Sequence, residues 1–131
     1  MLDIKFIREN PVLIREAARK KRLHFDVDTL LSADDARRTK IKEVEAMRAE
    51  ANAVAQAVPK IINEEDKRRA IEGMRVFKVK LGEKERELSD LETRFNTLMY
   101  EVPNIADPSV PEGTSDADNQ EVSRWGEVPQ F

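Results

Sequence analysis

The sequence contains no cysteine and a single histidine, His24, among its 131 residues. The absence of cysteine excludes disulfide bonds and thiolate metal sites, and one histidine cannot build a histidine-rich metal centre. Aromatic residues make up only 5% of the chain, which is too few for a thick globular core. No apolar run is long enough to span a membrane, and the N-terminus lacks a signal-peptide pattern. We therefore expect a cytoplasmic protein without a membrane partner.

Sequence motifs for catalysis are absent as well. There is no glycine-rich phosphate loop, no pairing of histidine with a nucleophile and no cluster of metal-ligating residues. Because 37% of the residues are charged, we expect the carboxylates on exposed helix faces, where no pocket holds an acid and a base together. We therefore expect no catalytic residue, no cofactor and no metal site in this chain.

What the sequence does contain is a heptad pattern. Ten positions separated by alternating steps of four and three are apolar except Lys84: Ala70, Met74, Phe77, Leu81, Lys84, Leu88, Leu91, Phe95, Leu98 and Val102. A shorter stripe precedes them, made of Val44, Met47, Ala51, Val54 and Val58. Two such stripes separated by Pro59 predict an all-α fold, in which two long helices form an antiparallel coiled-coil hairpin.

Local signals predict where these helices begin and end. Ser32 with Asp35 three residues later resembles a capping box, so we expect the first long helix to begin at Ser32 or Asp34 and to end near Val58. Asn63 followed by three acidic residues predicts the start of the second, which continues to about Tyr100. The arm then comprises residues 32–102, with its turn at about 59–63. Its far end should be the less stable end, because the first stripe has small side chains there.

The two ends of the chain have a different texture. Residues 1–31 are predicted to form a small helical base, with a helix that starts at Asn10-Pro11 and ends near Leu23. Residues 103–131 are rich in proline and polar residues and predict an irregular linker. Residues 121–125 have the composition of a short strand, but nothing in the chain supplies a partner strand. A tail of this kind suggests a linker toward a further domain that is missing here.

Several motifs, in order, resemble the N-terminal region of seryl-tRNA synthetases. The first are Met1-Leu2-Asp3, Phe6-Ile7-Arg8-Glu9-Asn10-Pro11 and Phe25-Asp26-Val27-Asp28, followed by Leu30-Leu31, Asp35, Arg38, Glu45, Arg48 and Asn52. The motifs in the tail are the most specific: Val102-Pro103-Asn104-Ile105, Ser109-Val110-Pro111-Glu112-Gly113, Asp118-Asn119, Glu121-Val122 and Trp125-Gly126. They resemble the segment that joins the helical arm of that family to its catalytic domain.

The resemblance implies a tRNA-binding arm of a serine-tRNA ligase. Such an arm recognises the long variable arm and the elbow of serine tRNA and positions the acceptor end for aminoacylation. The resemblance also implies a homodimeric parent whose class II catalytic domain uses ATP and Mg²⁺, although none of the motifs of that domain occurs here. Two alternatives stay open: a stand-alone coiled-coil module that binds a protein partner, and a paralogous arm without tRNA function.

Eight side chains on the predicted hairpin are candidates for tRNA binding. They are Arg48, Asn52, Gln56, Lys60, Lys67, Arg68, Arg75 and Lys78. A slim rod with such side chains suits RNA, whose duplexes are recognised mostly through shape and backbone. Near the turn, two basic positions and a glycine that the family usually carries are missing. The contacts have therefore moved to Lys60 and residues 67–69, or RNA binding is altered. Ordinary solvated charge is the other interpretation.

Overall fold

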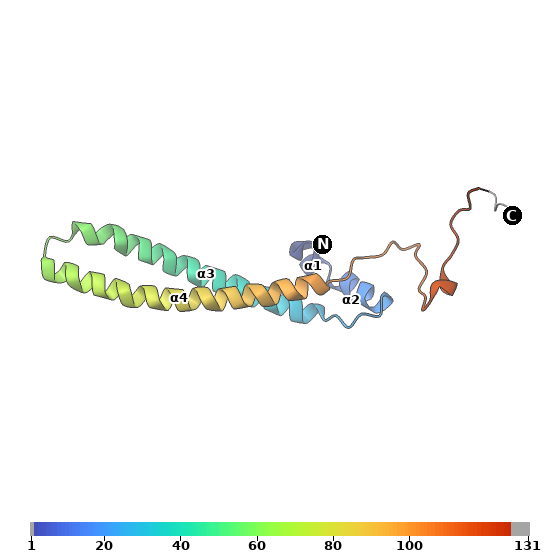
Figure 1. The fold of residues 1–131 in the computed structure, drawn as a ribbon, viewed down its shortest axis with the longest axis horizontal. Helices are drawn as coiled ribbons and strands as arrows, with labels where there is room; N and C mark the ends of the chain where they lie inside the picture. Colours follow the sequence, from blue (N-terminus) through green and yellow to red (C-terminus); the bar gives the residue numbers. More distant parts are fainter. Residues whose placement is uncertain (1, 127–131) are drawn as a thin grey trace, which may run out of the picture.

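Two long antiparallel helices dominate the fold (Figure 1). The computed structural model describes residues 2–126. Its helical elements are, in order, α1 (Ile4–Glu9), α2 (Pro11–Lys20), α3 (Val27–Ala57), the 3-10 turn η1 (Val58–Lys60), α4 (Glu64–Glu101) and the 3-10 turn η2 (Asp116–Asp118). Residues 2–126 contain no strand, and residues 121–125 form none despite their strand-like composition, in keeping with the lack of a partner strand. The predicted all-α hairpin is confirmed.

The seam of the hairpin follows the heptad spacing. All ten predicted seam positions, nine in α4 and Val102 directly after it, are buried or partly buried, and Phe95 is the most enclosed of the large ones. On α3, Val44 and Ala51 are buried in the same interface. Steps of three and four keep one face of each helix toward the other along the whole rod. Pro59 lies in η1, where α3 ends, and Asn63 caps α4 by accepting hydrogen bonds from the amides of Glu65 and Asp66.

The main hydrophobic core lies at the base end of the rod. It consists of Ile7 from α1, Ile14 from α2, Val27 and Leu30 from α3, and Phe95 and Met99 from α4. Each fully buried side chain of this size contributes about 1.5–3 kcal/mol to folding. Toward the turn the seam is thinner, and Val54 is already 36% exposed. This distribution agrees with the expectation of a weaker far end, which stays a prediction.

Helix α3 begins at Val27, so the predicted start at Ser32 or Asp34 is wrong. The N-cap is Asp26, whose carboxylate accepts hydrogen bonds from the Asp28 amide at 3.0 Å and from the Thr29 hydroxyl at 2.6 Å. Starting here places Val27 and Leu30 on the helix face that enters the core. Asp26 therefore prevails over the capping box predicted at Ser32, because it allows both a satisfied cap and two additional core residues.

The base contains a helix that the sequence pattern did not predict. Helix α1 spans only Ile4–Glu9 and is capped by Asp3, whose side chain accepts a hydrogen bond from the Lys5 amide at 3.1 Å. Pro11 occupies the first turn of α2, as expected. The Asn10 side chain, however, makes no capping hydrogen bond and instead donates to the Phe6 carbonyl at 3.0 Å. Asn10 thus closes α1 with its side chain and occupies the N-cap position of α2 without a side-chain capping bond.

Helix α2 ends at Lys20, before the predicted end near Leu23. Arg22 adopts a positive φ of 55°. The Leu23 amide donates to the Ala18 carbonyl at 2.9 Å, and the Arg22 amide donates to the Arg19 carbonyl at 3.0 Å. These two bonds form a Schellman motif, which requires the left-handed conformation at the position of Arg22. Glycine usually occupies that position, because any larger residue is strained there.

Replacing Arg22 by glycine is expected to raise the free energy of unfolding by up to about 1 kcal/mol. The gain arises because glycine adopts the left-handed conformation without steric cost, and it is reduced by the greater freedom of glycine in the unfolded chain. Urea denaturation followed by circular dichroism measures the change. Replacing the neighbouring Lys21, whose φ of −86° is ordinary, should give no such gain. A destabilised Arg22→Gly variant would contradict the strain argument.

After α4 the chain continues as an irregular linker that passes α2 and then extends beyond the base (Figure 1). The Glu112 carboxylate accepts two hydrogen bonds from the Arg19 guanidinium, at 3.1 and 3.3 Å. The ammonium of Lys20 lies 3.8 Å from the same carboxylate. Part of the basic run at the end of α2 thus pairs with the linker. The last five residues of the predicted linker lie outside the described residues. None of the helices described has the length and apolarity that a membrane crossing requires.

Candidate nucleic-acid interface

Charged side chains occupy the seam where the arm joins the base. Asp34 is only 1% exposed. Its carboxylate accepts hydrogen bonds from Arg8 Nε at 2.7 Å and from Arg37 Nη2 at 2.9 Å, and Arg8 also pairs with Asp35. Burial by itself raises the pKa of Asp34, but the hydrogen bonds from the two guanidinium groups outweigh it and keep that pKa below its usual range. The cluster ties α1 to α3.

The Arg37 guanidinium also connects the two long helices. It lies 4.2 Å from the centre of the Phe95 ring on α4, which is a cation–π distance. The guanidinium group of Arg37 therefore lies over the buried Phe95 ring and at the same time donates a hydrogen bond to the Asp34 carboxylate. This arrangement explains why a seam position close to the core can be arginine.

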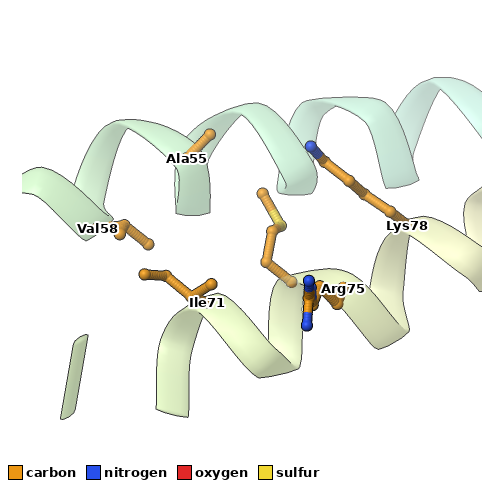
Figure 2. A pocket seen from close by; sticks show the side chains of 6 residues that line it. Ala55, Val58, Ile71, Arg75 and Lys78 are labelled. Atoms are coloured by element: carbon orange, nitrogen blue, oxygen red, sulfur yellow. The ribbon is translucent and has the colours of Figure 1, made fainter. Parts of the chain in front are cut away.

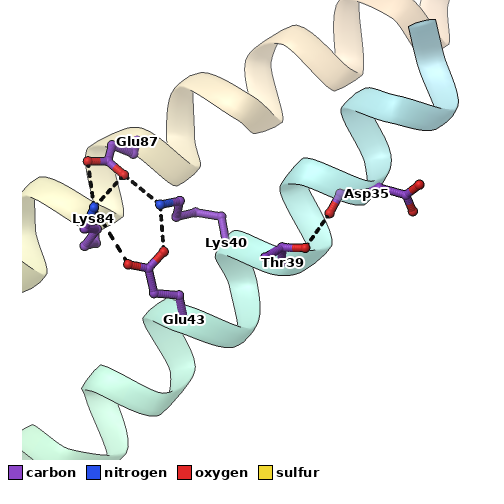
Figure 3. Close-up of polar contacts among 6 residues, drawn as sticks. All are labelled: Asp35, Thr39, Lys40, Glu43, Lys84 and Glu87. Atoms are coloured by element: carbon purple, nitrogen blue, oxygen red, sulfur yellow. Dashed lines mark hydrogen bonds and ion pairs between the residues drawn. The ribbon is translucent and has the colours of Figure 1, made fainter.

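A second charged cluster crosses the middle of the arm and is shown in Figure 3. Lys40 Nζ lies 2.7 Å from a carboxylate oxygen of Glu43 on its own helix and 2.7 Å from Glu87 on α4. Lys84 Nζ lies 3.0 Å from Glu87 and 3.7 Å from Glu43. Hydrogen bonds from Lys40 lower the pKa of both glutamates and raise its own pKa. Lys84 interrupts the apolar stripe because it faces the carboxylate of Glu43 across the seam.

Polar groups in a coiled-coil seam specify how the helices align along the axis. A shift of one turn would separate Lys84 from Glu43 and Lys40 from Glu87. The cluster of these four residues therefore favours a single register of the hairpin. Its charged groups are engaged with one another, so we do not count it among the groups offered to a ligand.

Arg48, the first of the predicted tRNA-binding residues, is also paired across the hairpin. Its Nε donates to Glu85 of α4 at 2.8 Å. Both side chains are substantially exposed, so solvent screens this ion pair and its contribution to stability is small. An anionic group of a ligand, such as a phosphate, can therefore compete with Glu85 for Arg48. Arg48 lies on the turn side of the cluster that Figure 3 shows, whereas Glu85 lies between its residues Lys84 and Glu87 along α4. Beyond Arg48, toward the turn, the character of the surface changes.

The far end of the arm carries an excess of basic residues. Residues 60–80 contain seven lysines and arginines against four acidic residues. On α4, Arg68, Ile71, Arg75 and Lys78 follow one another at helical steps of three and four, so they form one stripe along the helix. We call it the basic stripe. Lys67 adjoins it and lines a hollow together with Arg68 and Ile71.

The contacts of the stripe leave most of its charge available. Arg75 Nη1 lies 3.6 Å from Glu72 one turn earlier, in an exposed pair of little strength. For Lys67, Arg68 and Lys78, no ion pair forms within residues 2–126. Glu64 and Glu65 line the hollow beside Lys67 and Arg68, and they lower the positive potential near the helix start. By contrast, none of the described acidic residues lines the hollow that Arg75 and Lys78 border.

The remaining predicted residues come from the other helix and the turn. Asn52 and Gln56 are exposed on α3 and lie four residues apart. Lys60 is the last residue of η1 and is also exposed. The structure thus gathers four of the predicted residues, Lys67, Arg68, Arg75 and Lys78, on α4. Among the described residues it shows no hydrogen bond or ion pair between these four and the three residues from α3 and η1.

Apolar residues that the charge pattern of the sequence did not indicate also lie at this candidate interface. A hollow lies between the two long helices near the turn (Figure 2). Its apolar lining comes from Ile71 and Met74 of α4, Ala55 of α3 and Val58 of η1, and Arg75 and Lys78 stand at its edge. Ile71 could have been found from the spacing, because it stands at a helical step from both Arg68 and Arg75. The contributions of Ala55 and Val58 depend on how α3 and α4 pair, which the spacing along one helix does not show.

The chain is similar to proteins of known identity. A family model described as "Seryl-tRNA synthetase N-terminal domain" matches residues 1–106. A serine-tRNA ligase of Rubrobacter xylanophilus is 37% identical over the whole chain, and one of Deinococcus radiodurans is 42% identical. Among solved structures, the chain is similar to seryl-tRNA synthetase from Pyrococcus horikoshii complexed with ATP, with a TM-score of 0.74 and 34% sequence identity. The match covers 96% of this chain and 29% of the Pyrococcus chain. The chain spans 31% of the length of both relatives.

Proposed function

Because the chain belongs to the family of seryl-tRNA synthetase N-terminal domains, we propose that it acts as the tRNA-binding arm of a serine-tRNA ligase. In this role it recognises the long variable arm and the elbow of serine tRNA and positions the acceptor end of that tRNA for aminoacylation. The observation that supports the proposal most directly is the basic stripe near the end of a long, narrow hairpin.

The shape of the arm suits an RNA ligand. Helix α4 has 38 residues and therefore extends over about 57 Å at a rise of about 1.5 Å per residue. RNA helices expose phosphates and 2′-hydroxyl groups, and proteins recognise them mainly by shape. A slender rod with lysine and arginine along one side can lie beside such a backbone without an enclosing pocket. The turn end of the arm is the part farthest from the base, so it can contact a region of a large RNA that lies far from the base.

The relatives are serine-tRNA ligases, and the chain matches about a third of their length. We propose that the parent protein carries out ATP- and Mg²⁺-dependent serylation of tRNA as a homodimer, through a domain beyond this arm. The arm itself contributes binding and orientation. Holding the tRNA by a remote contact raises the effective concentration of its acceptor end at the catalytic site.

Filter retention of labelled tRNA tests the proposal. We expect the chain to bind serine tRNA, which has a long variable arm, more tightly than a tRNA with a short one. The logarithm of the binding constant should fall with the logarithm of the salt concentration, with a slope of about −0.9 for each phosphate contacted. Retention of neither tRNA at low salt would contradict the proposal. A homodimer in light scattering without RNA affinity would instead support a protein-interaction module.

A further inference from the structure

The basic stripe contains an apolar hollow that an interface made only for phosphates does not need. Ile71 is 46% exposed in its centre, between Arg68 and Arg75. Figure 2 shows Ile71 of α4 and Val58 of η1 pointing toward each other, with Ala55 of α3 above them. Because Ala55 is small, the space beside it is left open. The hollow measures about 220 Å³.

The edge of this hollow has one sign of charge. Its lining consists of Ala55, Val58, Ile71, Met74, Arg75 and Lys78, so both ionisable side chains are basic. Figure 2 shows Lys78 extending from α4 toward α3, across one end of the hollow. An apolar floor with a cationic edge is complementary to a group that is flat and apolar on its face and carries negative charge at its side.

An unpaired nucleotide has this combination, because its base presents an apolar face and its phosphates are anionic. We infer that the hollow holds the face of one unpaired base of the bound RNA, with Arg75 and Lys78 at the adjoining phosphates. Bases that are splayed out of a helix are commonly held by stacking and by arginine. An amphipathic protein helix is a poorer fit, since it needs a groove with successive anchor sites over two turns.

This inference rests on the proposed function, so its test compares variants that retain every basic side chain of the stripe. Ile71→Ala removes the floor of the hollow. Val76→Ala is the matched control, because Val76 is 53% exposed on the same helix but points about 140° away from Ile71 at 100° per residue. Both changes introduce a better helix former, so both variants should fold, which circular dichroism verifies.

We expect Ile71→Ala to weaken binding of serine tRNA by about fivefold, because the base loses apolar contact with the part of the isoleucine side chain that it covers. The slope of the salt dependence should not change, because no charge is lost. Val76→Ala should bind as the unaltered chain does. The effect of Ile71→Ala should disappear with a fully paired RNA duplex, which offers no unpaired base.

Three outcomes overturn the inference, and they differ in what they say about the proposed function. Unchanged tRNA binding by Ile71→Ala, with the unaltered chain binding well, refutes the base contact and leaves the tRNA-binding role intact. An equal loss on duplex RNA shows that the hollow contacts the backbone instead of a base. Failure of the unaltered chain to bind any tRNA refutes the proposed function, and the base contact with it.

Discussion

Reversing the charge of Lys67, Arg68 and Arg75 to glutamate is expected to weaken tRNA binding by about 100-fold or more at low salt. These residues lie at or beside the basic stripe on α4, and each positive group replaced by a negative one turns attraction to a phosphate into repulsion. The slope of the salt dependence should fall by about one for each phosphate contact that is lost. Filter retention over a series of salt concentrations measures both quantities.

The triple variant is expected to fold. Residues 67 and 68 belong to the first turns of α4, where glutamate interacts favourably with the positive end of the helix dipole. A suitable control reverses Lys5, Lys21 and Arg94, which are exposed at or near the base and change the net charge by the same amount. If both variants lose affinity equally, binding depends on net charge alone, and the assignment of the interface to the far end is wrong.

Replacing Asp34 by alanine is expected to lower the free energy of unfolding by about 3 kcal/mol. Removing one partner of a buried ion pair costs about 3–5 kcal/mol, and the lower end applies because both arginines remain partly exposed. Asp35→Ala is the matched control, since its side chain is 64% exposed and pairs with the same Arg8. It should cost less than about 1 kcal/mol. Equal losses in urea denaturation would contradict the special role of Asp34.

The contribution of Asp34 should depend on pH in a defined direction. Because its pKa in the folded protein lies below the value in the unfolded chain, its stabilising effect is fully present above about pH 4. The effect is lost as the pH falls through the folded-state pKa. The difference in stability between the original chain and Asp34→Ala should therefore narrow in acid. A difference that stays constant to about pH 2 would show that charge is not its source.

The glutamates of the mid-arm cluster, Glu43 and Glu87, also stabilise the folded protein less at low pH. Hydrogen bonds from Lys40 lower the pKa of Glu43 and Glu87, so this cluster also stabilises the hairpin less as the solution becomes acidic. These side chains are exposed, and salt screens their interactions far more than those of Asp34. The cluster is thus better understood as a determinant of register than as a large source of stability.

Much of the candidate interface was predictable because its residues lie on one helix. The steps of three and four that join Arg68, Arg75 and Lys78 are visible in the sequence once α4 is recognised. Arg48 was predicted as well, but its pairing with Glu85 was not, because that contact depends on the relative position of two helices. The hollow beside Ile71 was missed for the same reason, since Ala55 of α3 and Val58 of η1 complete the wall that α4 begins.

The helix boundaries in the base show where local signals compete. Both Asp26 and Ser32 are good N-caps, and the choice between them depends on whether Val27 and Leu30 enter the core. Likewise, nothing in the sequence suggests a positive φ at Arg22, because residues other than glycine rarely adopt the left-handed conformation. Such conflicts are decided by packing against other elements, and a residue-by-residue analysis of one segment does not contain that information.

The sequence by itself determined that this protein is a hairpin of two long helices, because heptad spacing, Pro59 and the cap at Asn63 act locally and periodically. Only the tertiary structure decided how the helices are aligned and how the base is attached. Those features depend on pairs such as Arg8 with Asp34 and Lys40 with Glu87, which are distant in sequence. Their energies exist only after the chain has brought the two partners together.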